Sequence, residues 1–128
     1  MTTSPLTKKL QVKPGRTLVV LGAPPGFLKL LEPFPEGARR LPSLRGRVDV
    51  LPVFVRTLRE ALAIVGKAKR GLVDKGILWV CYPKLTSASA GELSRDVLWK
   101  ALEPHGLGPV SMVAIDATWS AMRFRVVR

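Results

Sequence analysis

Charged and hydroxyl side chains follow several apolar runs of this sequence, at the points where strands are predicted to end. Lys84 lies with Thr86, Ser87 and Ser89 shortly before a predicted helix. The free amides and dipole of a helix start, together with hydroxyl groups and one ammonium group, can bind an anion. A capping sequence beside a solvated lysine has the same composition, so an anion site and a plain helix cap both remain open interpretations.

The stretch Asp116-Ala117-Thr118-Trp119-Ser120 lies between the last two apolar runs. A tight turn is served by aspartate or serine but does not need a tryptophan. Trp119 therefore either packs onto the core or stacks on a ligand. We favour packing, because the indole ring is first of all a large apolar body.

A stiff, glycine-containing loop, Gly22-Ala23-Pro24-Pro25-Gly26, follows the first apolar run. Dinucleotide and methyl-donor sites carry a glycine-rich loop at this position. The spacing here is not G-x-G-x-x-G, however, and the prolines remove amides that could hold phosphate. The acidic residue that binds ribose in such sites is also missing. We therefore favour a structural turn over a ligand-contacting loop. The sequence predicts no cofactor, and binding of S-adenosylmethionine (SAM) is not expected.

Cys81 and His105, the single cysteine and the single histidine, are the remaining candidates for a nucleophile and a base. Cys81 lies inside an apolar run, where cysteine usually packs as a small hydrophobic residue. His105 follows a predicted helix end, at the opposite edge of the predicted sheet. The aspartates are too scattered for a metal site. We therefore expect no metal, recognise no catalytic constellation, and do not expect methyltransferase activity.

The strands that position these residues are predicted by apolar runs. Residues 17–22, 48–55 and 77–82 are continuous runs, typical of parallel strands that are covered on both faces. Residues 110–116 and 121–127 are separated by only four residues, so they predict an antiparallel hairpin.

Helices are predicted mainly by two capping boxes, which begin at Thr57 and Ser89. In each box a hydroxyl accepts from the amide three residues later, and a glutamate returns the bond. Residues 35–47, rich in proline, glycine and arginine, predict a loop with at most one short strand, and Pro52 makes the strand after it irregular. The predicted helices span residues 27–31, 57–73 and 89–104.

This order of elements predicts one α/β domain at residues 17–128, after a polar lead-in at residues 1–16. Strands joined through helices form parallel units with right-handed crossovers. With its closing antiparallel hairpin, the segment at residues 48–127 resembles the final part of the methyltransferase-like Rossmann fold. The resemblance implies a truncated Rossmann-like, methyltransferase-like sheet of about five strands. It is mostly parallel, ends in a C-terminal antiparallel hairpin, and has the strand order 1-2-3-5-4.

Three stretches resemble the signature stretches of a bacterial family of small proteins that is known only as a domain of unknown function. They are residues 21–27 (LGAPPGF), 79–84 (WVCYPK) and 116–124 (DATWSAMRF). The resemblance covers residues 16–127. It implies the fold and its boundaries, and it supplies no mechanism.

In open parallel sheets, ligands bind beyond the carboxyl ends of the strands. The cations expected at this edge favour a small anionic ligand such as a phosphate or a nucleotide, on which Tyr82 or Trp119 could stack. Arg123 differs from the others in lying on the returning strand, just past the predicted hairpin. The predicted ligand-binding residues are Gly22, Ala23, Pro24, Gly26, Arg56, Tyr82, Lys84, Ser87, Asp116, Thr118, Trp119, Ser120 and Arg123.

The chain of 128 residues is strongly basic, with 21 Lys+Arg against 9 Asp+Glu and a net charge of +12. Such a charge suggests a nucleic-acid partner. The cations are spread along the sequence, however, and the aromatic residues, at 6%, do not interleave with them. We therefore favour a solvated basic surface on a small-ligand binding module. A nucleic-acid-associated protein and a non-catalytic interaction or oligomerisation domain are the alternatives.

The sequence has no apolar run near the ~18 residues of a membrane span and no secretory signal. We expect a cytoplasmic protein without a membrane partner, as a monomer or a small homo-oligomer. The absence of asparagine and the many arginines and prolines resemble a thermophile composition.

Overall fold

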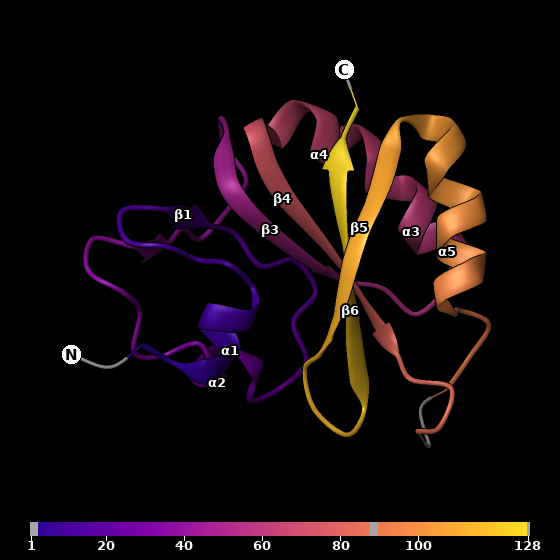
Figure 1. Cartoon of the computed structure of the whole chain (residues 1–128), viewed down its shortest axis with the longest axis horizontal. Helices are drawn as coiled ribbons and strands as arrows, with labels where there is room; N and C mark the ends of the chain where they lie inside the picture. The colour runs from indigo at the N-terminus through magenta and orange to yellow at the C-terminus, as the bar shows by residue number, and fades with distance from the viewer. Residues whose placement is uncertain (1–2, 88–89, 128) are drawn as a thin grey trace.

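A six-stranded mixed sheet forms the centre of the computed structural model, which describes residues 3–87 and 90–127 (Figure 1). Strands β1 to β4 run parallel, and β6 runs antiparallel to its neighbours β4 and β5. The strands are β1 (Thr17–Leu18), β2 (Arg39–Arg40), β3 (Val48–Phe54), β4 (Leu72–Pro83), β5 (Leu107–Ala114) and β6 (Trp119–Val126). Their order is β2-β1-β3-β4-β6-β5. The predicted fold class is confirmed. The five expected strands keep their predicted order, and the short β2 is added outside β1.

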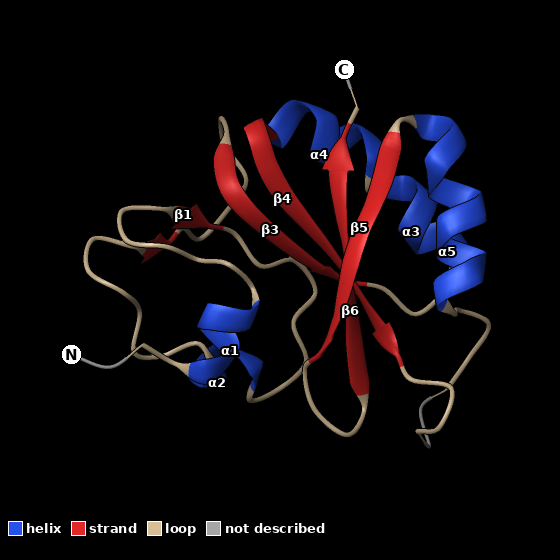
Figure 2. Ribbon diagram, viewed as in Figure 1, coloured by secondary structure: helices blue, strands red, loops and turns tan. Residues whose placement is uncertain are grey.

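Helices cover both faces of the sheet (Figure 2). They are α1 (Pro5–Lys9), α2 (Phe27–Leu30), α3 (Leu58–Ala63), α4 (Val65–Gly71) and α5 (Arg95–Leu102), with a 3-10 turn, η1 (Glu103–His105), after α5. Helices α3 to α5 pack on Leu78 and Val80 of β4, whereas α1 and α2 pack on Trp79 and Cys81. Strand β4 is therefore buried on both faces, as its continuous apolar run predicts. No helix in the described ranges is long and apolar enough to cross a membrane.

Strand β1 is shorter than the run predicted at residues 17–22, and Pro52 explains the difference. Leu21 donates its N–H to the Pro52 oxygen at 3.0 Å, and Phe54 donates to the Leu21 oxygen at 2.9 Å. The proline nitrogen carries no hydrogen, so β3 lacks one donor toward β1. The regular ladder is interrupted there, and an isolated bridge joins Leu21 to Val53.

The helix predicted over residues 57–73 divides at Ile64 into α3 and α4, and α4 ends directly before β4. Its capping box is confirmed. The Thr57 hydroxyl accepts from the Glu60 amide at 3.1 Å, and the Glu60 carboxylate accepts from the Thr57 amide at 3.1 Å. The valine and the glycine that follow the break both lower helix propensity, which explains why one helix becomes two.

The helix predicted over residues 89–104 begins later, as α5, so its predicted start is wrong. The expected cap, Ser89, lies outside the described residues. The N-cap of α5 is Ser94, whose hydroxyl accepts an amide hydrogen bond from the first turn at 3.2 Å. The Glu92 carboxylate accepts from the Leu58 amide at 3.1 Å, so it joins the start of α3 and not its own local cap.

The segment before β1, expected to be a polar lead-in, packs against the sheet. Leu6 and Leu10 are buried beside Trp79. The buried Thr7 hydroxyl donates to the Leu31 oxygen at 2.6 Å, which joins α1 to the end of α2. This segment therefore forms part of the second layer on the sheet.

Strand β5 forms the outer edge of the sheet beyond β6. Pro109 lies within it, and the register with β6 shifts between Pro109 and Ser111, which leaves Val110 as an extra residue. Such a bulge bends the strand and interrupts regular pairing. The predicted hairpin is confirmed, although both strands begin a few residues earlier than expected.

Candidate functional site

The carboxyl ends of β3 and β4 and the amino end of β6 meet at one edge of the sheet. Tyr82 of β4 pairs with Ser120 of β6. Directly beyond them, the Lys84 amide donates to the Thr118 oxygen at 2.7 Å. Four of the residues predicted to bind a ligand therefore lie side by side at this edge.

The loop at residues 22–26 follows β1 to the same edge. Gly22 has a φ of +72°, and a Cβ there would lie 3.0 Å from the Phe54 oxygen. Gly26 has a φ of +86° and precedes α2. Both glycines therefore serve the backbone path, which supports the structural-turn interpretation. The residues between them that were also predicted as ligand contacts, Ala23 and Pro24, are half-buried.

Asp116 caps the tip of the β5–β6 hairpin. Its Oδ1 accepts the N–H groups of Thr118 and Trp119, each at 2.8 Å. The Ser87 hydroxyl donates to the Lys84 oxygen at 2.8 Å, within the loop that follows β4. The Asp116 carboxylate, the Thr118 backbone and the Ser87 hydroxyl thus hold these two loops in shape.

Aromatic rings fill this edge on the face that α1 and α2 cover. The Trp119 ring, in a residue only 5% exposed, lies 5.0 Å from the Phe54 ring in an edge-to-face arrangement. Phe54 lies 4.6 Å from Phe27 of α2 in the same way. The Arg56 guanidinium lies 5.0 Å from the Trp119 centroid, a cation–π distance. Trp119 is a packing residue here, as favoured from the sequence, and Arg56 covers it.

A cavity of about 440 Å³ opens at this edge beside α5. Because Tyr82 packs in the core beneath α3 to α5 and Trp119 packs beneath α1 and α2, the sheet separates this cavity from the aromatic cluster. The cavity combines two cations, one carboxylate and several hydroxyl groups. Among the residues that line it are Tyr82, Lys84, Thr86, Arg95, Asp96 and Ser120.

Burial raises the pKa of the Tyr82 hydroxyl, while a hydrogen bond with Ser120 and the charge of Arg95 partly oppose the shift. Tyr82 is therefore a neutral hydrogen-bonding group at neutral pH. Burial also raises the pKa of the Cys81 thiol strongly, and its weak hydrogen bond to the Trp79 oxygen at 3.9 Å does not activate it. Cys81 is a buried hydrophobic residue, as its place in an apolar run predicts.

Arg123 does not join the other predicted site residues. It pairs with Trp79, four residues along β6 from Trp119 and toward the amino ends of the parallel strands. It lines two cavities there, away from Lys84. Arg123 therefore lies outside the group of predicted site residues that gather at the carboxyl edge.

Two charged residues of the cavity, Arg95 and Asp96, were missed from the sequence. The reason is that the predicted N-cap, Ser89, lies five residues before the observed N-cap, Ser94, so both residues fall in the interior of the predicted helix. A serine followed by aspartate in the first turn is a helix-start signal, and Ser94 with Asp96 carries it. Arg95 is also held by the Trp99 ring, at 5.5 Å from its centroid.

No protein-family model matches the chain, and no curated protein matches it in sequence. Solved structures do match in fold. A SAM-dependent methyltransferase from Aquifex aeolicus is 15% identical, with a TM-score of 0.65 over 94% of this chain and 87% of that one. A ribosomal protein L11 methylase from Lactobacillus delbrueckii subsp. bulgaricus is 12% identical, with a TM-score of 0.61 over 96% of this chain and 75% of that one.

Fibrillarin from Aeropyrum pernix, in complex with natively bound SAM, is 18% identical, with a TM-score of 0.61 over 90% of this chain and 68% of that one. At these identities the likeness is one of fold. The chain has the Rossmann-like fold of SAM-dependent methyltransferases. Membership of the bacterial family of unknown function stays a prediction, since no family model matches.

The expectation that the protein uses no cofactor, and that SAM does not bind, is wrong. It rested on the proline-containing loop and the missing ribose-binding acid. The solved structures with this fold are SAM-dependent methyltransferases, and one holds natively bound SAM. The loop at residues 22–26 lacks the G-x-G-x-x-G spacing, but this difference alone does not exclude SAM as a ligand.

Proposed function

We propose that this protein binds a small anionic or nucleotide-like ligand in the cavity between the ends of β4 and β6 and the start of α5. The observation that carries the proposal is the presence of Lys84 and Arg95 in one cavity of about 440 Å³. The cavity lies at the carboxyl edge of the parallel strands, where sheets of this class bind their ligands.

The chemistry of the lining supports an anionic group. Lys84 supplies an ammonium and Arg95 a guanidinium, against the single carboxylate of Asp96. Arginine binds carboxylates and phosphates in two-pronged geometry, and lysine adds a point charge. Tyr82, with a neutral hydroxyl, and Ser120 also line the cavity, and their hydroxyl groups can fix the orientation of the ligand.

SAM and S-adenosylhomocysteine are the first ligands to test, because the solved structures with this fold are SAM-dependent methyltransferases. Both compounds carry a carboxylate that Lys84 and Arg95 can neutralise. AMP and ATP test the phosphate alternative. The fold by itself does not define the chemistry, so activity is measured separately from binding.

The experiment is titration calorimetry with these four compounds, together with thermal unfolding. A ligand at 100 times its Kd stabilises the native state by about 2.7 kcal/mol, which gives a clear rise in Tm. We expect Lys84→Gln and Arg95→Gln each to weaken binding about tenfold, or about 1.4 kcal/mol. The matched control is Lys100→Gln, an exposed lysine on α5 outside the cavity.

Two results would count against the proposal. One is that none of the four compounds raises the Tm of the wild-type protein. The other is that a compound binds but Lys84→Gln, Arg95→Gln and Lys100→Gln all retain wild-type affinity. The second result would place the ligand elsewhere on the molecule.

A further inference from the structure

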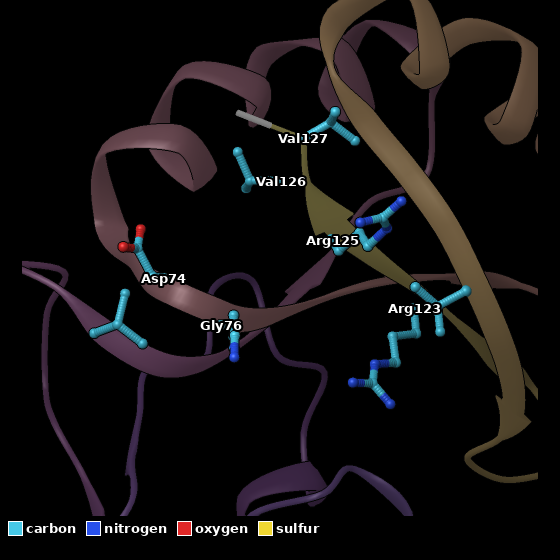
Figure 3. Close-up of a pocket in the computed structure, with 9 residues that line it drawn as sticks. Asp74, Gly76, Arg123, Arg125, Val126 and Val127 are labelled. Carbon is cyan, nitrogen blue, oxygen red and sulfur yellow. The ribbon is translucent and has the colours of Figure 1, made fainter.

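Two adjoining cavities occupy the opposite, amino end of the sheet, on the face that carries Trp119 and Ala121. One has a volume of about 530 Å³ and lies between the first residues of β4 and the last residues of β6 (Figure 3). The second, of about 150 Å³, extends toward the loop before β1. Lys75 and Arg123 line both, so the two cavities adjoin, and together they are called the basic groove.

Cations dominate the basic groove although they are far apart in the sequence. Arg123 and Arg125 project from β6 on one face because they alternate with the buried Phe124. Figure 3 shows them across the groove from Asp74 and Gly76 of β4. The cations that line the groove are Lys13, Arg16, Lys75, Arg123 and Arg125.

Carboxylates compensate these charges only in part. Asp49 forms an ion pair with Arg16 at 3.4 Å and accepts from the Thr17 amide at 2.8 Å, so it is already occupied. Among the described residues, Asp74 is the other carboxylate of the lining. Within the described part of the chain, no ion pair is formed by Lys75, Arg123 or Arg125. With five cations and two carboxylates among its described lining residues, the groove has a local net positive charge.

The backbone near the start of β4, where Lys75 lies, has an unusual conformation. Lys75 has a φ of +64°, a left-handed conformation that is rare outside glycine. A Cβ on the next residue, Gly76, would lie 2.8 Å from the Val73 oxygen, so the turn at this point requires glycine. Strained backbone of this kind often accompanies binding sites.

We propose that the basic groove binds the phosphate backbone of single-stranded nucleic acid. The five cations supply the charge, and three of the four valines that line the larger cavity, Val110, Val126 and Val127, supply apolar contact for sugars or bases. The lining contains no aromatic ring among the described residues, so recognition is by phosphate and is independent of sequence. This site lies at the opposite end of the strands from Lys84 and is independent of the function proposed above.

The test uses two fluorescent single strands of 12 nucleotides, one of uridine and one of deoxythymidine. Binding is measured at several KCl concentrations with the full chain. The groove variant is the triple substitution Lys75→Gln, Arg123→Gln and Arg125→Gln. The matched control, Arg39→Gln, Arg59→Gln and Lys100→Gln, removes the same charge from exposed positions outside the groove.

We expect the wild-type protein and the control variant to bind at least one strand with similar affinity. The groove variant should bind at least tenfold more weakly at low salt. Each lost phosphate contact lowers the slope of log K against log salt by about 0.7, so three lost contacts lower it by about 2. Lys84→Gln should leave this binding unchanged. Circular dichroism and thermal unfolding verify that both triple variants are folded.

Three outcomes overturn the proposal. Equal losses in the two triple variants would mean that net charge alone attracts nucleic acid. Binding of neither strand, while inorganic tripolyphosphate binds in calorimetry, would assign the groove to free phosphates. If the groove variant fails to fold, the single variant Arg125→Gln is measured instead. Arg125 is exposed and lies on β6, so this substitution leaves the sequence of β4 unchanged. Wild-type affinity and salt slope in that variant would then reject the groove.

Discussion

The indole nitrogen of Trp79 donates a hydrogen bond to the carbonyl oxygen of Leu10 at 2.9 Å, across 69 positions of sequence. Both residues are buried, so neither group has water as a replacement partner. This contact fixes the segment before β1 to the middle strand of the sheet. It explains why a stretch that reads as polar in sequence forms part of the packed structure.

Replacing Trp79 with phenylalanine removes this hydrogen bond and leaves the Leu10 oxygen buried without a donor. We expect the free energy of unfolding to fall by about 1–3 kcal/mol, measured by urea titration. Trp99→Phe is the matched control, because that indole is exposed and its N–H donates to the exposed Glu103 carboxylate at 3.3 Å. Equal losses in the two variants would contradict the assigned role of the contact.

Gly22→Ala should destabilise the protein more than Gly26→Ala. Both glycines have a left-handed backbone, so both substitutions cost about 1–2 kcal/mol of strain. Only the new methyl group at position 22 also meets the Phe54 oxygen, at 3.0 Å, whereas nothing lies within 4 Å at position 26. Thermal unfolding measures the difference. A larger loss at position 26 would be inconsistent with the described loop.

Asp116→Ala should loosen the tip of the β5–β6 hairpin. The substitution removes the acceptor of two amide hydrogen bonds, from Thr118 and Trp119, and should cost about 1–2 kcal/mol of unfolding free energy. Asp116→Asn keeps an Oδ1 acceptor and should stay within about 0.5 kcal/mol of wild type. If asparagine is as damaging as alanine, the negative charge and not the turn is what matters.

Stability should decrease in alkaline solution because of Cys81 and Tyr82. Burial raises the pKa of both groups in the folded state, whereas the unfolded chain releases their protons at about pH 8.5 and 10. Above these values the unfolded state binds fewer protons than the native state. The free energy of unfolding therefore falls as pH rises, and the full stabilisation is present below about pH 8.5.

Urea titrations from pH 7 to pH 10.5 measure this slope. Cys81→Ala and Tyr82→Phe should each make it shallower than in wild type, and comparison at equal pH removes the contribution of the many lysines. A slope that both substitutions leave unchanged would show that neither group keeps its proton in the folded state.

The positions of the main strands and the hairpin could be predicted from the sequence, because continuous apolar runs and a four-residue gap are local signals. The strand order was predicted from the resemblance to the methyltransferase-like fold. The start of α5 could not. Ser89 and Glu92 match a capping box, but Glu92 is engaged by the Leu58 amide, a contact that only the tertiary structure creates. Arg95 and Asp96 were lost from the predicted site for the same reason.

The predicted set of site residues gathers at one edge but does not form one pocket. Trp119 and Ser120 are neighbours in β6, so their side chains point to opposite faces of the sheet. Because neighbouring residues of a strand point to opposite faces, the sequence alone could have assigned the predicted site residues of this strand to two separate sites. The basic groove was not predictable in this way, because Lys75 and Arg123 line the same cavities only through the pairing of β4 with β6.

The outer strand β5 also decides how the protein behaves at high concentration. A sheet edge with a regular row of free amides and carbonyls can recruit another chain and start a fibre. Here Pro109 supplies no N–H, and the bulge at Val110 breaks the spacing a second strand would need. Despite the exposed Val110 and Met112 at this edge, a crowded solution of the folded chain should resist polymerisation through β5.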